Sequence, residues 1–163
     1  MSGISPLGWV HTLGSLPALP LALIMVFRSG RIEPRSPAGK AYLAFMLIGT
    51  ITVYPLAHAQ AGVMLATTTL GLLIVGFAVG HWRALGRAAV YIETIALSLT
   101  VFLLLLPTVT EILRRLPAGH PIAASLESPI LRAVHLALLA GLVVGLVVQV
   151  RALRRRALPR RHA

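Results

Sequence analysis

Long apolar runs separated by short, mostly basic stretches dominate the pattern of this chain. A helix rises about 1.5 Å per residue, so about 20 apolar residues cross the roughly 30 Å hydrocarbon core of a bilayer. The runs of this length predict five membrane-spanning helices, at residues 7–27, 41–59, 62–80, 88–110 and 129–150. We therefore expect an all-α fold in which residues 1–150 form a single polytopic membrane helical bundle and residues 151–163 form a basic tail.

The basic residues between the runs are distributed unevenly between the two sides of the membrane. One side carries Arg28, Arg31, Arg35, Lys40, Arg83, Arg87, Arg151, Arg154, Arg155, Arg156, Arg160 and Arg161. The other side carries only Arg114, Arg115 and Arg132. Because an excess of Lys and Arg marks the cytoplasmic face, the pattern predicts an outside N-terminus and a cytoplasmic C-terminus. The Ala-, Leu- and Arg-rich composition favours a bacterial inner membrane.

Helix breakers and small residues refine the predicted spans. Pro17 and Pro20 lie in the middle of the first run and predict a kink there. Residues 60–62 form a very short turn, so the second and third spans should be an antiparallel hairpin. Gly141 and Gly145 form a G-x-x-x-G pair, a pattern that permits close helix approach in membranes.

Composition supports a membrane protein and removes several other classes. The chain is 57% hydrophobic, whereas soluble domains are about 45–50% apolar. Its net charge of +11 lies in loops and the tail, which indicates contact with anionic lipid headgroups rather than nucleic acid. The chain has no Cys, which excludes disulfides, thiolate metal sites and covalent c-type haem attachment. No hydrolase, P-loop or dinucleotide motif is present, so no enzyme class is indicated.

Four histidines belong to the predicted outer half of the protein, namely His11, His58, His120 and His135. His11 lies about 6 Å deep in the first span and His135 about 9 Å deep in the fifth. Polar residues inside a membrane are unfavourable and usually face the bundle interior or a cavity. This shared depth makes the outer histidines the leading candidates for a functional site.

The leading hypothesis is a b-type haem or redox site formed by these histidines. Two neutral imidazoles at similar depth on different helices can ligate the iron. His11 and His135 are the first choices, with His58 as the substitute and Gly14, one turn from His11, making room. Arg132, together with the two arginines after span four, would pair with the propionates.

Several alternatives remain open from the residues alone. A copper or zinc site would draw on His11, His58, His135, Met64 and Glu111. A pocket for a quinone or another lipid-soluble molecule would be lined by His58 and Tyr54, which share a helix face. In a different class, the protein would be a non-catalytic membrane subunit or assembly factor, with a membrane-protein partner or a homo-oligomer burying its histidines. Interfacial histidines without a ligand are the simplest interpretation.

Glu93 is the one acidic residue inside a predicted span, roughly 8 Å from its inner end. An intramembrane carboxylate is a functional candidate by default, for instance as a proton or cation relay. A structural ion pair or a protonated side chain is the favoured interpretation. The expected partners are Arg87, Arg83, Lys40 and His81.

The chain resembles an uncharacterised family of small bacterial multi-span membrane proteins, known only as a domain of unknown function. The pieces that carry the resemblance are His11, the segment Arg35-Ser-Pro-Ala-Gly39-Lys-Ala-Tyr42, the segment His81-Trp-Arg-Ala-Leu-Gly-Arg87, and Leu106-Pro107. Family members carry His-Arg pairs in the two basic turns, whereas this chain has Arg35-Ser36 in the first. The resemblance implies a polytopic membrane protein, related in architecture to small haem-binding helical bundles, and implies no specific activity.

Overall fold

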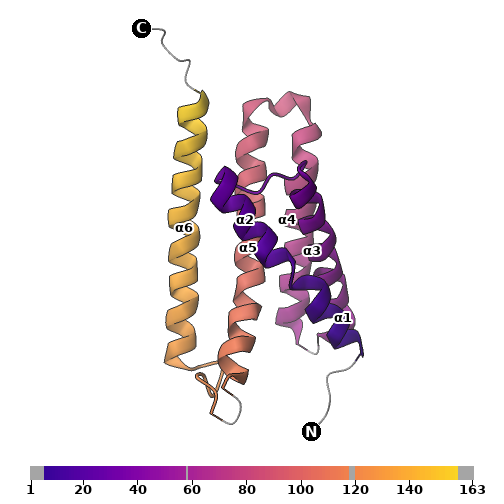
Figure 1. Cartoon of the computed structure of the whole chain (residues 1–163), viewed down its shortest axis with the longest axis vertical. Coiled ribbons are helices and arrows are strands. Elements are labelled where there is room, and N and C mark those ends of the chain that lie inside the picture. The colour runs from indigo at the N-terminus through magenta and orange to yellow at the C-terminus, as the bar shows by residue number, and fades with distance from the viewer. Residues whose placement is uncertain (1–5, 58, 118–119, 158–163) are drawn as a thin grey trace. The chain divides into compact units, whose positions relative to one another are not determined.

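The computed structural model describes residues 6–57, 59–117 and 120–157 and is helical without strands over these ranges. Its elements are α1 (Pro6–Ser15), α2 (Ala18–Ser29), α3 (Pro37–Leu56), α4 (Gln60–Ala78), the short 3-10 helices η1 (Val79–His81) and η2 (Arg83–Leu85), α5 (Arg87–Arg115) and α6 (Pro129–Ala157) (Figure 1). The helices divide into two compact units, residues 1–100 and 101–163. The first part of α5 belongs to unit 1 and the remainder to unit 2.

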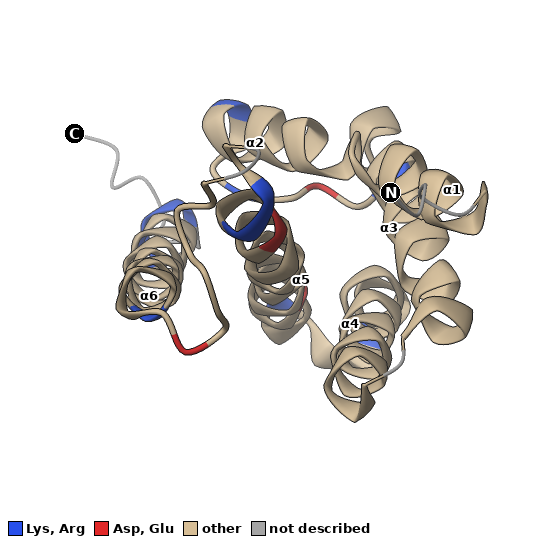
Figure 2. Cartoon of the chain, turned by 90° about the horizontal axis from the view of Figure 1, so that it is seen from below, with Lys and Arg blue, Asp and Glu red and all other residues tan. Residues whose placement is uncertain are grey.

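Five helical segments of the described chain are long and apolar enough to cross a membrane. They cover Pro6–Ser29, Pro37–Leu56, Gln60–His81, Arg83–Arg115 and Pro129–Arg156. Most of the ribbon carries neither kind of charge, and far more Lys and Arg than Asp and Glu positions are marked (Figure 2). The prediction of an all-α multi-pass membrane protein with five spans is confirmed.

The first span is broken into α1 and α2, as its prolines predict. Because Pro17 lacks a backbone N–H, the helix ends at Ser15 and a new one begins at Ala18. α2 ends at Ser29 and is followed by Gly30, whose φ of 76° is the left-handed conformation common after a helix C-terminus. The N-terminus of α3 is capped by Ser36, whose hydroxyl oxygen accepts from the Gly39 N–H at 2.9 Å.

In unit 1, α3 packs against α1, α2 and α4. The first part of α5 joins this group, since the hydroxyls of Tyr42 on α3 and Thr100 on α5 are hydrogen-bonded at 2.8 Å and both side chains are fully buried. α5 also approaches α4 closely, because a Cβ at Gly76 would lie 2.6 Å from Leu97 Cγ. These contacts form the core of unit 1. Many other apolar side chains of its helices face outward and are exposed.

Unit 2 contains the second part of α5, the connection after it and α6. The backbone N–H of Ala123 donates to the Leu113 carbonyl at 2.9 Å, which ties the connection back to α5. α6 continues to Ala157, beyond the predicted span end at residue 150, so the first residues of the basic tail are helical. A Cβ added at Gly141 or Gly145 would meet no atom of the described residues within 4 Å, and the role of this pair in close helix packing stays a prediction.

Candidate functional site

His11 is held by two oxygens of α3. Its Nδ1 lies 3.1 Å from the Gly49 carbonyl oxygen and 2.9 Å from Thr52 Oγ1. The Thr52 hydroxyl has one proton, which it donates to the Ile48 carbonyl at 2.6 Å, so towards His11 it acts as an acceptor. Both contacts therefore require a proton on Nδ1, which leaves the lone pair of Nε2 unused by these bonds.

Small residues bring α1 and α3 close enough for this arrangement. A Cβ at Gly49 would lie 2.7 Å from Ser15 Cβ, closer than side chains pack. A Cβ at Gly14 would collide with the Ile48 side chain. The expectation that Gly14 makes room for a haem is therefore wrong, because Ile48 of the neighbouring helix already fills that space.

His135 forms a similar bond in unit 2, through its other nitrogen. Its Nε2 lies 2.9 Å from Thr110 Oγ1 on α5. The Thr110 hydroxyl donates to the Leu106 carbonyl at 2.7 Å, so it accepts from the Nε2–H of His135. The two first-choice histidines thus expose different nitrogens, since His135 retains the lone pair of Nδ1.

The remaining predicted site residues are dispersed along the two units. Met64 on α4 is exposed in unit 1, and Arg132 is exposed in the first turn of α6 in unit 2. Glu111 is paired with Arg115 one turn later on α5, as the sequence spacing predicts. His58, common to the haem, metal and quinone hypotheses, lies outside the described residues.

The described residues give the copper or zinc hypothesis no support. Within them, no group of three or more His, Cys, Asp or Glu side chains is arranged to hold a metal ion. Of the candidate ligands, Glu111 is engaged by Arg115. Tyr54, a candidate for the quinone pocket, has its hydroxyl 3.0 Å from Thr67 Oγ1 on α4.

Glu93 is the most deeply buried charged residue described, with 2% of its side chain exposed. Its Oε1 accepts from Arg31 Nη1 at 2.8 Å, and its Oε2 lies 3.3 Å from Arg35 Nη2. Both arginines come from the connection between α2 and α3. Glu93 thus forms an ion pair, as one of the favoured interpretations predicts, and the arginines that bind it are not among the possible partners Arg87, Arg83, Lys40 and His81.

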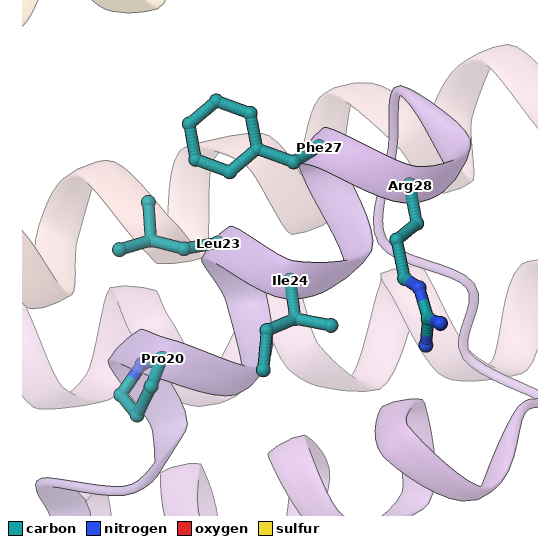
Figure 3. Close-up of a pocket in the computed structure, with 5 residues that line it drawn as sticks. All are labelled: Pro20, Leu23, Ile24, Phe27 and Arg28. Carbon is teal, nitrogen blue, oxygen red and sulfur yellow. The ribbon is translucent and has the colours of Figure 1, made fainter.

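A shallow hollow runs along α2 in unit 1. It is lined by Pro20, Leu23, Ile24 and Phe27, with Arg28 at its end (Figure 3). The lining is apolar except for Arg28, and none of the histidines that the structure describes belongs to it. This composition suits a lipid acyl chain better than a reactive site.

Sequence reasoning missed the residues that hold the candidate side chains. Thr52 and Thr110 orient the two histidines, and Arg31 and Arg35 bind Glu93. A threonine in an apolar run is a weak signal for such a role, because most intramembrane threonines bond only to their own helix. The sequence pattern identifies Arg31 and Arg35 only as part of the basic cytoplasmic face. Their spacing does not predict a contact with Glu93.

Comparison with known proteins finds a partial relative of this chain. No family model matches the chain, and no solved structure matches it. An alignment of 95 positions, which covers 54% of this chain, is 36% identical to a protein named Heme A synthase from Chelativorans sp. (strain BNC1). The matched segment is 26% of the length of that protein, so the chain spans about a quarter of the curated relative that it resembles.

Proposed function

We propose that this protein is a small integral membrane protein that binds b-type haem, with His11 as an axial ligand. The observation that carries the proposal is the pair of bonds from His11 Nδ1 to Gly49 and Thr52, which leaves Nε2 for iron. Histidines that ligate metals usually donate their other ring N–H to a carbonyl or a similar acceptor, which fixes the tautomer and the ring orientation. His11 has this arrangement.

The residues present fit a haem bound without covalent attachment. The chain has no Cys for thioether bonds, and a neutral imidazole is a common axial ligand of haem iron. A second neutral imidazole would complete the site, and the sequence offers His135 first and His58 as the substitute. Arg132, three residues before His135, would pair with a propionate.

The partial likeness to a protein named Heme A synthase supports an association with haem. From this likeness we propose haem binding for this chain and no enzymatic activity, because the match covers about a quarter of that relative. A bound haem would supply one-electron redox chemistry. With an outside N-terminus in a bacterial inner membrane, His11 would lie near the periplasmic face.

The test is an absorption spectrum of the detergent-purified protein, oxidised and dithionite-reduced, after expression with ample haem. We expect a Soret band at stoichiometric haem, its loss in His11→Gly, and its return when imidazole is added to that variant. His120→Ala, in an exposed connection, is the matched control and should keep the band. A wild-type protein that remains colourless after haem titration would refute the proposal.

A second candidate function is a non-catalytic membrane subunit or assembly factor. The observation in its favour is that His11 and His135 each bond a threonine on another helix, which is a sufficient structural role for an intramembrane histidine. This interpretation predicts a colourless protein in which Thr52→Val and His11→Gln lower the helix-packing stability equally. Co-purification with one membrane-protein partner would support it.

A further inference from the structure

The charged cluster around Glu93 holds more positive than negative charge. Arg31 and Arg35 both contact the single carboxylate of Glu93, so one positive charge is left over. The connection with the ends of its helices carries Arg28, Arg31, Arg35 and Lys40 and one acid, Glu33, and Glu93 of α5 contacts two of these arginines. Uncompensated charge at the edge of the hydrocarbon is unfavourable, which calls for a further anion.

The geometry of the cluster leaves donors for such an anion. A guanidinium has five N–H groups, and the contacts to Glu93 use one nitrogen of each arginine. The Arg35 side chain is 56% exposed, whereas the carboxylate that holds it is 2% exposed. Glu93 therefore holds the Arg35 guanidinium at Nη2, while more than half of the Arg35 side chain remains exposed.

Gly80 makes room for this guanidinium. A Cβ at Gly80 would collide with Arg35 Nη2 and lie 2.7 Å from Arg35 Cζ and 3.0 Å from Glu93 Oε2. The missing side chain at Gly80, in the middle of η1, thus leaves space for the end of the Arg35 side chain beside Glu93 of α5. This space and the buried carboxylate together hold a long, flexible side chain in one place.

From these observations we infer that Arg31 and Arg35 bind the phosphate of an anionic phospholipid in the inner leaflet. Guanidinium groups match the oxygens of a phosphate in a fork geometry, and basic pockets between spans on the cytoplasmic side are typical headgroup sites. The positive-inside rule assigns this end of unit 1 to the cytoplasm. The apolar hollow of α2 has Arg28 in its lining, three residues before Arg31, and an acyl chain lying in it would follow the helix that leads to the cluster (Figure 3). This inference is independent of haem binding.

The experiment compares the full-length wild type with single variants by native mass spectrometry and thermal unfolding in detergent, with added phosphatidylglycerol or phosphatidylcholine. Wild type should retain phosphatidylglycerol preferentially and gain thermal stability from it. Arg35→Ala should bind it at least about fivefold more weakly, since a basic residue near the surface contributes about that factor. Arg155→Ala, at the exposed end of α6, removes the same charge outside the cluster and should lower this binding less than Arg35→Ala does.

A second pair of variants keeps every charge. Gly80→Ala should displace Arg35 and lower phosphatidylglycerol binding, whereas Gly71→Ala on α4, with no atom within 4 Å of the added Cβ among the described residues, should not. This pair decides the outcome if Arg35→Ala fails to fold. Equal effects of the two lipids on wild type, or undiminished phosphatidylglycerol binding in Gly80→Ala, would overturn the inference. An equal stabilisation by inorganic phosphate alone would assign the site to a free anion and overturn the lipid as its occupant.

Discussion

Replacing Glu93 by Gln should destabilise the protein far more than the same change at Glu111 on the same helix. The Gln side chain keeps one acceptor oxygen and removes the negative charge, leaving Arg31 and Arg35 unpaired. Breaking a buried ion pair costs about 3–5 kcal/mol of unfolding free energy. Because Arg31 is 22% and Arg35 56% exposed, part of their charge regains hydration, and we expect a loss of about 2–3 kcal/mol.

The assay is reversible unfolding by SDS in mixed micelles, followed by far-UV circular dichroism. Glu111→Gln is the control, since its pair with Arg115 has both side chains at least half exposed. Such a pair contributes about 0.5 kcal/mol or less, so this variant should unfold almost as wild type does. If Glu93→Gln also stayed within that small margin, the assignment of Glu93 as an organising buried charge would be refuted.

Three further predictions concern helix packing, the histidine site and a surface carboxylate. Gly49→Ala should lower the unfolding free energy by about 1–3 kcal/mol, because the added methyl group would push α1 away from α3. Gly71→Ala, the control, should leave the unfolding free energy unchanged or raise it, and SDS unfolding measures both. Thr52→Val should weaken haem binding about tenfold in a haem titration, because His11 loses one of its two acceptors; unchanged affinity would contradict its positioning role. Hydrogen bonds from its own backbone N–H and from a nearby serine lower the pKa of Glu127, so its small contribution to stability is present at neutral pH and disappears as pH falls through that lowered pKa. A carboxyl-carbon NMR titration should give a midpoint below that of an ordinary glutamate, and a midpoint at or above it would contradict the assignment.

The spans could be predicted from the sequence because the bilayer imposes one length on every crossing helix. The break in the first span was also predictable, since Pro17 cannot donate the bond that continues the helix. The ends were less accurate: the second span was expected to reach residue 59, but α3 ends at Leu56, directly after Pro55. Hydropathy records what contacts lipid and says little about where the last backbone hydrogen bond forms.

The side-chain contacts were much less predictable, because they depend on how separate helices are aligned. His11 and Thr52 are 41 residues apart, and no local pattern connects them. The partners of Glu93 were sought among neighbouring turns, whereas the path of the chain after Gly30 delivers Arg31 and Arg35 instead. The apolar spans were readable from the sequence, whereas the rotation of each helix about its axis was not.

The break between α1 and α2 has a consequence for how the chain is inserted during synthesis. Helices of 10 and 12 residues rise about 15 and 18 Å, so neither alone crosses the roughly 30 Å hydrocarbon core. The insertion machinery must therefore accept the two halves as one hydrophobic segment. α1 and α2 each pack on α3, the next segment to be synthesised, so the bent form acquires its packing partner only after the first span has entered the membrane. His11 belongs to the first span, but the contacts that orient its side chain come from α3 in the second span.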